Sequence, residues 1–152
     1  MNNTELFLDR LTELFKTPIP GHVIAKARLS LLDYLGVTLA GARGIEDKIA
    51  NYLKFVNPEP GEITAIGLGR RMNLKDAVFL NGLNGHALDF DDGTNIGIIH
   101  LGSPLFSVLL PLAQRYGIDS DKFLKAAIIG YETSFTMAVS IQPGHKEMGY
   151  HA

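Results

Sequence analysis

The amino-acid sequence predicts an all-α, mostly helical fold, and three observations lead to this prediction. Apolar residues recur every three to four positions in several segments, which is the period of an amphipathic helix. Capping residues, glycines and prolines stand where these segments begin and end. Strand-like alternation is confined to one short segment. We therefore expect at least five helices in a single helical domain over residues 1–152, with at most a small β-hairpin around 62–68.

The N-terminal part of the chain contains three of the predicted helices, at 4–16, 22–40 and 45–56. Prolines follow the first helix, and the glycine-containing sequence GARG is expected to end the second. The second helix is apolar on nearly all sides, as expected of a buried helix. The sequence NPEPG stops the third helix, and the strand candidate EITAIGLG follows it.

The rest of the chain contains three further helices. Asn73 can cap a helix that runs to His86. Ser103 is expected to be the N-cap of the next helix, with Pro104 as its first residue, and this helix ends before Gly117. The last predicted helix begins at Ser120. The segment from Asp89 to His100 is therefore expected to be a loop that joins two helices.

Composition excludes several classes of function. The formal net charge is -2 and no basic stripe is present, so nucleic acid is not an expected partner. The chain has no cysteine, which rules out disulfides, thiolate zinc sites and a cysteine nucleophile. Its N-terminus lacks the pattern of a signal peptide, and no segment approaches the roughly 20 apolar residues of a membrane span. We expect a cytoplasmic protein that does not bind a membrane.

Ionisable side chains are concentrated in the sequence HALDFDDGTNIGIIHLGSP, residues 86–104. The cluster Asp89, Asp91 and Asp92 follows the C-terminal end of a predicted helix, where the helix dipole disfavours negative charge by about 0.3–1 kcal/mol. A partner should therefore compensate these carboxylates. The simplest interpretation is a solvated loop whose Asp and Thr side chains bond to their own backbone.

Two metal-dependent enzyme classes are alternative interpretations of this acidic cluster, and the sequence fits neither well. The sequence DFDDGT resembles the nucleophile loop of Mg-dependent haloacid-dehalogenase-like phosphatases, but that loop follows a buried parallel strand and here the preceding segment is helical. Asp92 also stands as an extra residue before Gly93. The other alternative is the acidic motif of an all-α terpenoid-type synthase, which would need a second acidic cluster that this sequence lacks.

A third alternative is an acid and base site that uses imidazoles together with carboxylates. His100 precedes a predicted helix start, so an anion beside it could also meet free backbone N–H groups. An imidazole can supply a proton or a positive charge at neutral pH. Asp89 or Asp91 could orient the ring by accepting a hydrogen bond from it.

Five motifs in the same order resemble the N-terminal helical part of the MmgE/PrpD family, which includes 2-methylcitrate dehydratase and cis-aconitate decarboxylase. They are LLDYLGVTLAGAR, NLKDAVFLNG, NGLNGHALDFDDGTNIGIIHLGSP, AAIIGYETSFTMAVSI and HKEMGYHA, and together they span nearly the whole chain. The resemblance implies a lyase or isomerase that uses no metal and no organic cofactor. It also implies chemistry at a carbon beside a carboxylate of a small di- or tricarboxylate.

The resemblance implies four catalytic residues in this sequence: Asp89, Thr94, His100 and His151. The two histidines would carry protons or positive charge around the substrate carboxylates, Thr94 would donate a hydroxyl, and Asp89 would orient an imidazole. The family pattern usually has no residue in the place of Gly93, so the Thr94 hydroxyl is expected to be displaced. His151 is the next-to-last residue of this sequence.

The remaining candidates have structural interpretations. The structural interpretation of Asp89 is a cap for backbone N–H groups of its loop. His86 is expected to pack against the preceding helix, and His22 and His145 are expected at the surface or at caps. Tyr131 lies in an apolar helix and is expected to pack its ring there.

Family members are much longer than 152 residues, so we expect a helical domain that is incomplete relative to the family. Near the motifs only Lys146 offers a cation for a polycarboxylate, so the chain is expected to be inactive alone. We expect a homo-oligomer, most simply a homodimer, or a second polypeptide that completes the enzyme. The alternative from a different class is a non-catalytic helical assembly module.

Overall fold

The computed structural model describes residues 2–150 and confirms the mostly helical fold. The helices of this range are α1 (Asn3–Lys16), α2 (Gly21–Gly44), α3 (Glu46–Val56), α4 (Leu74–His86), α5 (Gly102–Tyr116), α6 (Ser120–Ile141) and α7 (Gly144–Glu147). The strands are β1 (Ile63–Ala65), β2 (Arg70–Met72), β3 (Gly93–Thr94) and β4 (Ile99–His100). They form two antiparallel pairs, β1 with β2 and β3 with β4. The first pair extends the hairpin expected around 62–68, and the second was not expected from the sequence.

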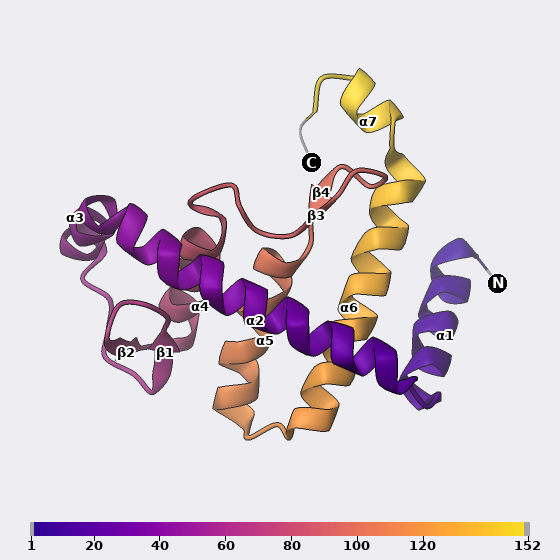
Figure 1. Ribbon diagram of the computed structural model, residues 1–152, viewed down its shortest axis with the longest axis horizontal. Helices are drawn as coiled ribbons and strands as arrows, with labels where there is room; N and C mark the ends of the chain where they lie inside the picture. The colour runs from indigo at the N-terminus through magenta and orange to yellow at the C-terminus, as the bar shows by residue number, and fades with distance from the viewer. Residues whose placement is uncertain (1, 151–152) are drawn as a thin grey trace.

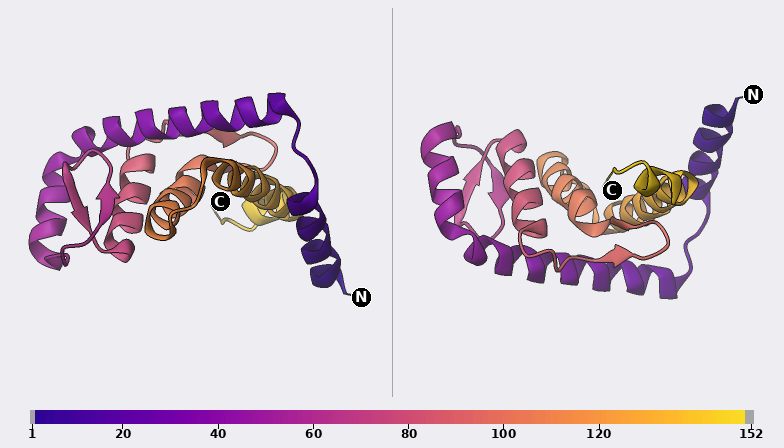
Figure 2. Two further views of the ribbon diagram at one scale, coloured as in Figure 1. Left: turned by 90° about the horizontal axis from the view of Figure 1, so that it is seen from below. Right: turned by 90° about the horizontal axis from the view of Figure 1, so that it is seen from above.

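The long helix α2 crosses the whole molecule, and the later elements pack on one side of it (Figures 1 and 2). Helix α4 makes its most extensive contacts with α2 and α5, and α6 contacts both α5 and α2. Helix α1 extends away from this body and contacts α6. Its capping box, formed by Asn2 and Glu5, begins the helix as the sequence allows.

Helix α2 continues through GARG to Gly44 and does not end near Ala40 as expected. The reason is tertiary packing: a Cβ added to Gly41 would lie 2.0 Å from the backbone oxygen of Asn84 in α4. Gly41 therefore allows the backbones of α2 and α4 to approach closely within a continuous helix. The same glycine that resembles a helix stop in the sequence is a packing residue in the fold.

The buried apolar residues form two clusters. One joins α2, α5 and α6 and contains Ala27, Tyr34, Phe106, Phe123, Leu124 and Ala127. The other joins α3, the first strand pair and α4 and contains Ile49, Ile63, Ala65, Met72, Ala77 and Leu80. Helix α4 contributes to the second cluster and packs on α2 and α5, which contribute to the first, and the site described below begins at its last residue.

The β1–β2 hairpin is held by side-chain amides from two helices. The Asn81 side chain of α4 accepts a hydrogen bond from the Ile66 N–H (2.8 Å) and donates one to the Thr64 carbonyl (3.1 Å). The Gln114 side chain of α5 accepts from the Thr64 N–H (2.9 Å) and donates to the Glu62 carbonyl (2.9 Å). Asn81, the first asparagine of the sequence NGLNGH, therefore has a structural role.

Helix α5 begins at Gly102, and Leu101 takes the N-cap position without a side-chain hydrogen bond. The expected Ser103 cap is therefore wrong, although the predicted helix is correct. Ser103 is buried against α4, where its hydroxyl lies 3.5 Å from the Gly82 carbonyl. The loop residue Asp92 satisfies the first helix N–H instead, with its Oδ1 atom 2.6 Å from the Gly102 nitrogen.

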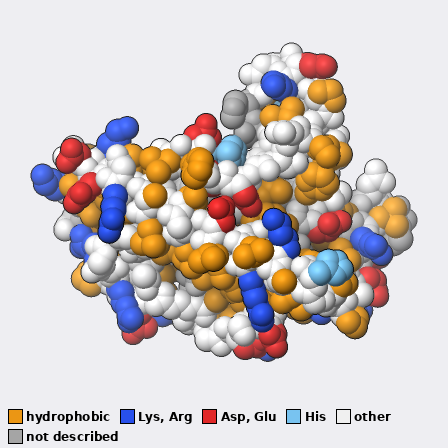
Figure 3. All heavy atoms as spheres, in the orientation of Figure 1, with side chains coloured by type: hydrophobic (Ala, Val, Ile, Leu, Met, Phe, Trp, Pro, Cys, Tyr) orange, Lys and Arg blue, Asp and Glu red, His pale blue; other side chains and the backbone are white. Residues whose placement is uncertain are grey.

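The described part of the chain contains no helix that is both long and apolar enough to cross a membrane. Apolar side chains are nevertheless present in patches on the face that α2 crosses (Figure 3). Leu29, Leu32 and Leu39 of α2 are 59%, 66% and 50% exposed. This helix therefore has apolar side chains both in the core and on the outer surface.

Candidate functional site

The segment that contains the candidate site joins α4 and α5, as expected of a loop between two helices. It begins after His86, forms the short β3–β4 pair, and ends at His100. Asp89 and Ile98 have left-handed backbones, with φ values of 50° and 52°. That conformation is strained for a β-branched residue such as Ile98, and strained residues are concentrated at functional sites.

Two imidazoles and one buried carboxylate form the centre of this segment. The Asp91 side chain is 2% exposed, and its Oδ1 atom lies 2.8 Å from His86 Nδ1 and 3.4 Å from His100 Nδ1. The two rings contact each other edge to face, with centroids 4.9 Å apart. Asp91 therefore bridges the last residue of α4 and the last residue of β4.

The contacts of His100 define the positions of its ring nitrogens. Its Nδ1 atom lies 3.2 Å from the backbone oxygen of Asp91, which can only accept a hydrogen bond. Nδ1 must therefore carry the proton, and in the neutral ring Nε2 keeps the free lone pair. Nε2 lies 3.4 Å from Asp89 Oδ1, and the Asp89 side chain is 80% exposed.

His100 also lines a cavity of about 550 Å³. The cavity is lined by Asp91, Gly93, Thr94, Asn95, Ile98, Ile99, His100 and Lys146. Its volume is within the range of small-molecule sites, roughly 300–1,000 Å³. The β3–β4 pair thus contributes Thr94 and His100 to the lining of this cavity, and α7 contributes Lys146.

Asp92 belongs to a different network, on the side of α6. Its Oδ2 atom accepts a hydrogen bond from the Tyr131 hydroxyl at 2.5 Å, and its Oδ1 atom accepts one from the Gly102 N–H. Burial raises the pKa of Tyr131 well above its usual value, and the Asp92 carboxylate raises it further. The N–H of Gly102 at the start of α5, which the sequence analysis considered as part of an anion pocket, is thus paired with Asp92.

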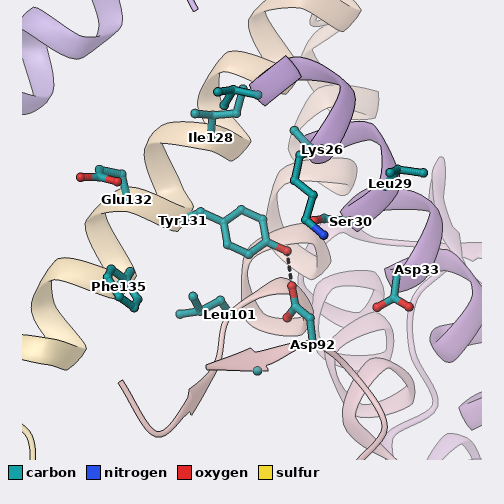
Figure 4. A pocket seen from close by; sticks show the side chains of 13 residues that line it. Lys26, Leu29, Ser30, Asp33, Asp92, Leu101, Ile128, Tyr131, Glu132 and Phe135 are labelled. Carbon is teal, nitrogen blue, oxygen red and sulfur yellow. Dashed lines mark hydrogen bonds between the residues drawn. The ribbon is translucent and has the colours of Figure 1, made fainter. Parts of the chain in front are cut away.

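The Asp92–Tyr131 pair lines a second, larger cavity of about 680 Å³ between α2 and α6 (Figure 4). Lys26, Ser30 and Asp33 of α2 face it from one side and Tyr131 from the other. Gly93 lines both cavities. Neither His86 nor His100 lines this larger cavity, so we place the candidate chemistry in the smaller one.

The structure brings together three of the four predicted site residues. Asp89 contacts His100, and Thr94 and His100 line the same cavity. His151 lies outside the described residues. Asp91, one of two proposed orienters of the imidazole, is the buried partner, while Asp89 is the exposed one.

Sequence reasoning missed His86 as a member of the site. It was expected to pack against its helix, but its side chain is 54% exposed and bonds to Asp91. A histidine and an aspartate five residues apart do not by themselves predict a contact, so the sequence gives no signal for this pair. Tyr131 packs its ring on Phe106, as expected, but its bond to Asp92 could not be read from the sequence.

Comparison with known proteins gives the family. The profile of the MmgE/PrpD N-terminal domain matches residues 9–152. The chain belongs to the MmgE/PrpD family. The segment that contains the candidate site lies wholly inside the matched range.

A curated member of similar sequence is the cis-aconitate decarboxylase-like protein oryM of Aspergillus oryzae. It is 29% identical to this chain over an alignment of 140 positions, which covers 87% of this chain and 29% of that protein. The chain therefore spans less than a third of the length of this MmgE/PrpD relative.

The fold also argues against the phosphatase alternative. A haloacid-dehalogenase-like nucleophile loop follows a strand of a parallel sheet, whereas the strand pairs within residues 2–150 are antiparallel and the segment before Asp89 is helix α4. The terpenoid-type alternative needs a second acidic cluster across the cavity, and Lys146 faces that cavity instead.

Proposed function

We propose that this chain supplies part of the active site of a cofactor-independent lyase or isomerase that acts on small di- or tricarboxylates. The observation that carries the proposal is the cavity in which Thr94, His100 and Lys146 meet. A cation and a hydroxyl donor can bind a carboxylate there, beside an imidazole whose Nδ1 proton is fixed. The membership of the MmgE/PrpD family and the similarity to a cis-aconitate decarboxylase-like protein support the same substrate class.

In this proposal His100 Nε2 exchanges a proton with a carbon beside a substrate carboxylate. In a dehydration His100 takes the proton of the C–H bond, the electron pair of that bond forms the new double bond, and the neighbouring C–O bond breaks. The leaving hydroxide takes the proton back from His100 and departs as water. In a decarboxylation the C–C bond breaks, carbon dioxide leaves, and the carbanion takes a proton from His100. Asp91 stabilises the protonated ring in both cases because its carboxylate lies 3.4 Å from His100 Nδ1.

Electrostatics sets the limit of what this chain does by itself. Asp91 is paired with histidines and Asp92 with Tyr131, so Asp89 is the exposed carboxylate beside the cavity. Lys146 is the cation that lines the cavity in the described residues. A di- or tricarboxylate carries two or three negative charges, and we therefore propose that the chain alone binds such a ligand weakly and needs further cations for turnover.

The test is binding of cis-aconitate and 2-methylcitrate to the isolated chain, followed by NMR chemical shifts. We expect shifts at Thr94, His100 and Lys146, and a several-fold weaker affinity in Lys146→Ala because one cation is lost from the cavity. Lys26→Ala is the matched control, since Lys26 lines the other cavity. Shifts confined to the Lys26 cavity, or none with either acid, would contradict the proposal and favour a non-catalytic assembly module.

A further inference from the structure

We propose that His86, Asp89, Asp91 and His100 form a binding site for a divalent transition-metal ion, with Zn²⁺ as the best match. One nitrogen or oxygen atom of each residue lies within 4.8 Å of the corresponding atoms of the other three. A tetrahedral zinc site has metal–ligand distances of about 2.0–2.2 Å, so its ligand atoms are separated by about 3.3–3.5 Å. The contact of 3.4 Å between His100 Nε2 and Asp89 Oδ1 already matches this separation, and Asp91 Oδ1 lies 2.8 Å from His86 Nδ1.

The strongest support is the unpaired oxygen of Asp91. Its side chain is 2% exposed, and its Oδ2 atom is buried without a hydrogen-bond partner. A buried carboxylate oxygen without a partner is costly, because it has lost its hydration and gained nothing in return. A cation bound to Asp91 would remove this cost.

Charge in the site also favours a dication. Asp89 and Asp91 contribute two carboxylates, and within residues 2–150 their ion-pair partners are histidines, with no lysine or arginine among them. With neutral imidazoles the four residues carry a net charge of about -2. A divalent ion neutralises that charge, whereas a monovalent ion would leave half of it.

The ligand types select the ion. Two imidazoles with carboxylates are typical ligands of zinc and neighbouring transition ions. Mg²⁺ and Ca²⁺ prefer sites made of oxygen ligands, so they should bind here much more weakly. The Nδ1 atom of His100 donates to the Asp91 carbonyl, which leaves Nε2 as the coordinating nitrogen and holds the ring in position, as outer hydrogen bonds do in metal sites.

This ion is not a cofactor of the proposed reaction. The Nε2 lone pair of His100 cannot coordinate an ion and accept a proton at the same time, so zinc and catalysis exclude each other at this residue. Only this competition rests on the proposed function. The binding itself involves no substrate and is measured without one.

The test is titration of the purified 152-residue chain with ZnCl₂ by isothermal calorimetry. We expect one ion per chain, and an affinity that falls at least tenfold in Asp91→Asn and in His86→Gln, since loss of outer-sphere partners alone typically costs about 10- to 100-fold. His22→Gln is the matched control, because His22 lies at the beginning of α2, outside the cluster. It should bind zinc as the wild type does.

Two further measurements keep the result interpretable. The His86 side chain is more than half exposed, so His86→Gln should fold normally, and circular dichroism measures this. The comparison of this variant with the wild type therefore tests the proposal even if Asp91→Asn does not fold. Co²⁺ bound to the wild type should give the visible absorption of a four- or five-coordinate site, and an excess of Mg²⁺ should leave it unchanged. Absence of stoichiometric zinc binding, or equal affinity in His86→Gln and the wild type, would overturn the proposal.

Discussion

Two adjacent aspartates, Asp91 and Asp92, serve two separate networks. Asp91 bonds to the histidines at the end of α4 and β4, whereas Asp92 bonds to Gly102 and to Tyr131 of α6. The backbone bends at Asp91, just before β3, and the two neighbouring side chains reach different elements. The sequence DD therefore fixes the loop to α4 on one side and to α5 and α6 on the other.

Replacing Tyr131 tests the second network. Tyr131→Phe removes the hydroxyl that donates to the Asp92 carboxylate, while the ring contact with Phe106 remains. We expect the free energy of unfolding to fall by about 1.5–3 kcal/mol, the usual value for a hydrogen bond to a charged group. Urea denaturation measures it. Tyr116→Phe is the control, because Tyr116 is 67% exposed, and a loss as large there would contradict the assignment.

The same variant should change the stability of the protein at alkaline pH. Burial and the Asp92 carboxylate raise the pKa of Tyr131 in the folded state, so its contribution is fully present below the unfolded value of about 10. That contribution is lost as the pH rises toward the folded value. The stability difference between wild type and Tyr131→Phe should therefore narrow above pH ~10. Burial also raises the pKa of Tyr34 to about 12. The stability that Tyr34 loses at alkaline pH is the same in the wild type and in Tyr131→Phe, so it does not affect the difference between them.

The residue scale is also where sequence reasoning was least complete. The position of His100, Asp89 and Thr94 around one site followed from a motif in which these residues are close in the chain. The partners of Asp92 and the role of His86 depend on how α4 and α6 pack, and Tyr131 is 39 residues from Asp92. No local pattern specifies a contact of that kind.

At the scale of elements, the helices were predicted well and their ends less well. Hydrophobic periodicity is a property of the segment itself, so it identified six of the helices. The end of α2 and the start of α5 are set by Gly41 against Asn84 and by Asp92 on Gly102, which are tertiary contacts. The β3–β4 pair has two residues per strand, too few for an alternation pattern.

A pair of glycine substitutions in α2 tests the close approach to α4. Gly41→Ala places a Cβ 2.0 Å from the backbone oxygen of Asn84, and backbone cannot move as a flexible side chain does. We expect a loss of about 3 kcal/mol or more in the free energy of unfolding. Gly36→Ala meets no atom within 4 Å, so its higher helix propensity should raise the stability by up to about 1 kcal/mol. Thermal and urea unfolding of both variants measure this, and equal effects would contradict the packing argument.

At the scale of the whole molecule, the long helix α2 carries three apolar side chains on the surface, Leu29, Leu32 and Leu39, each at least half exposed. The homo-oligomer predicted from the sequence stays a prediction, and this surface is where we propose that it forms. Gly93 lines both the cavity near His100 and the α2–α6 cavity.

Sedimentation velocity over a range of concentrations tests this prediction. We expect the wild type to form a dimer, because a two-fold pair is the commonest closed assembly. Leu32→Glu, at a position that is 66% exposed on α2, should shift the equilibrium toward monomer because it would bury a charge. Leu8→Glu is the control, since Leu8 is 56% exposed on α1. A wild type that remains monomeric at all concentrations would contradict the prediction.

The amide contacts around the β1–β2 hairpin have a consequence for local opening of the fold. The N–H groups of Thr64 and Ile66 donate to side chains of Gln114 and Asn81, which belong to α5 and α4. A hairpin with three residues in each strand is too short to be stable in isolation. Hydrogen exchange at these two amides therefore requires α4 or α5 to separate from the hairpin, so their exchange rates report the opening of the helices and not fraying of the strands.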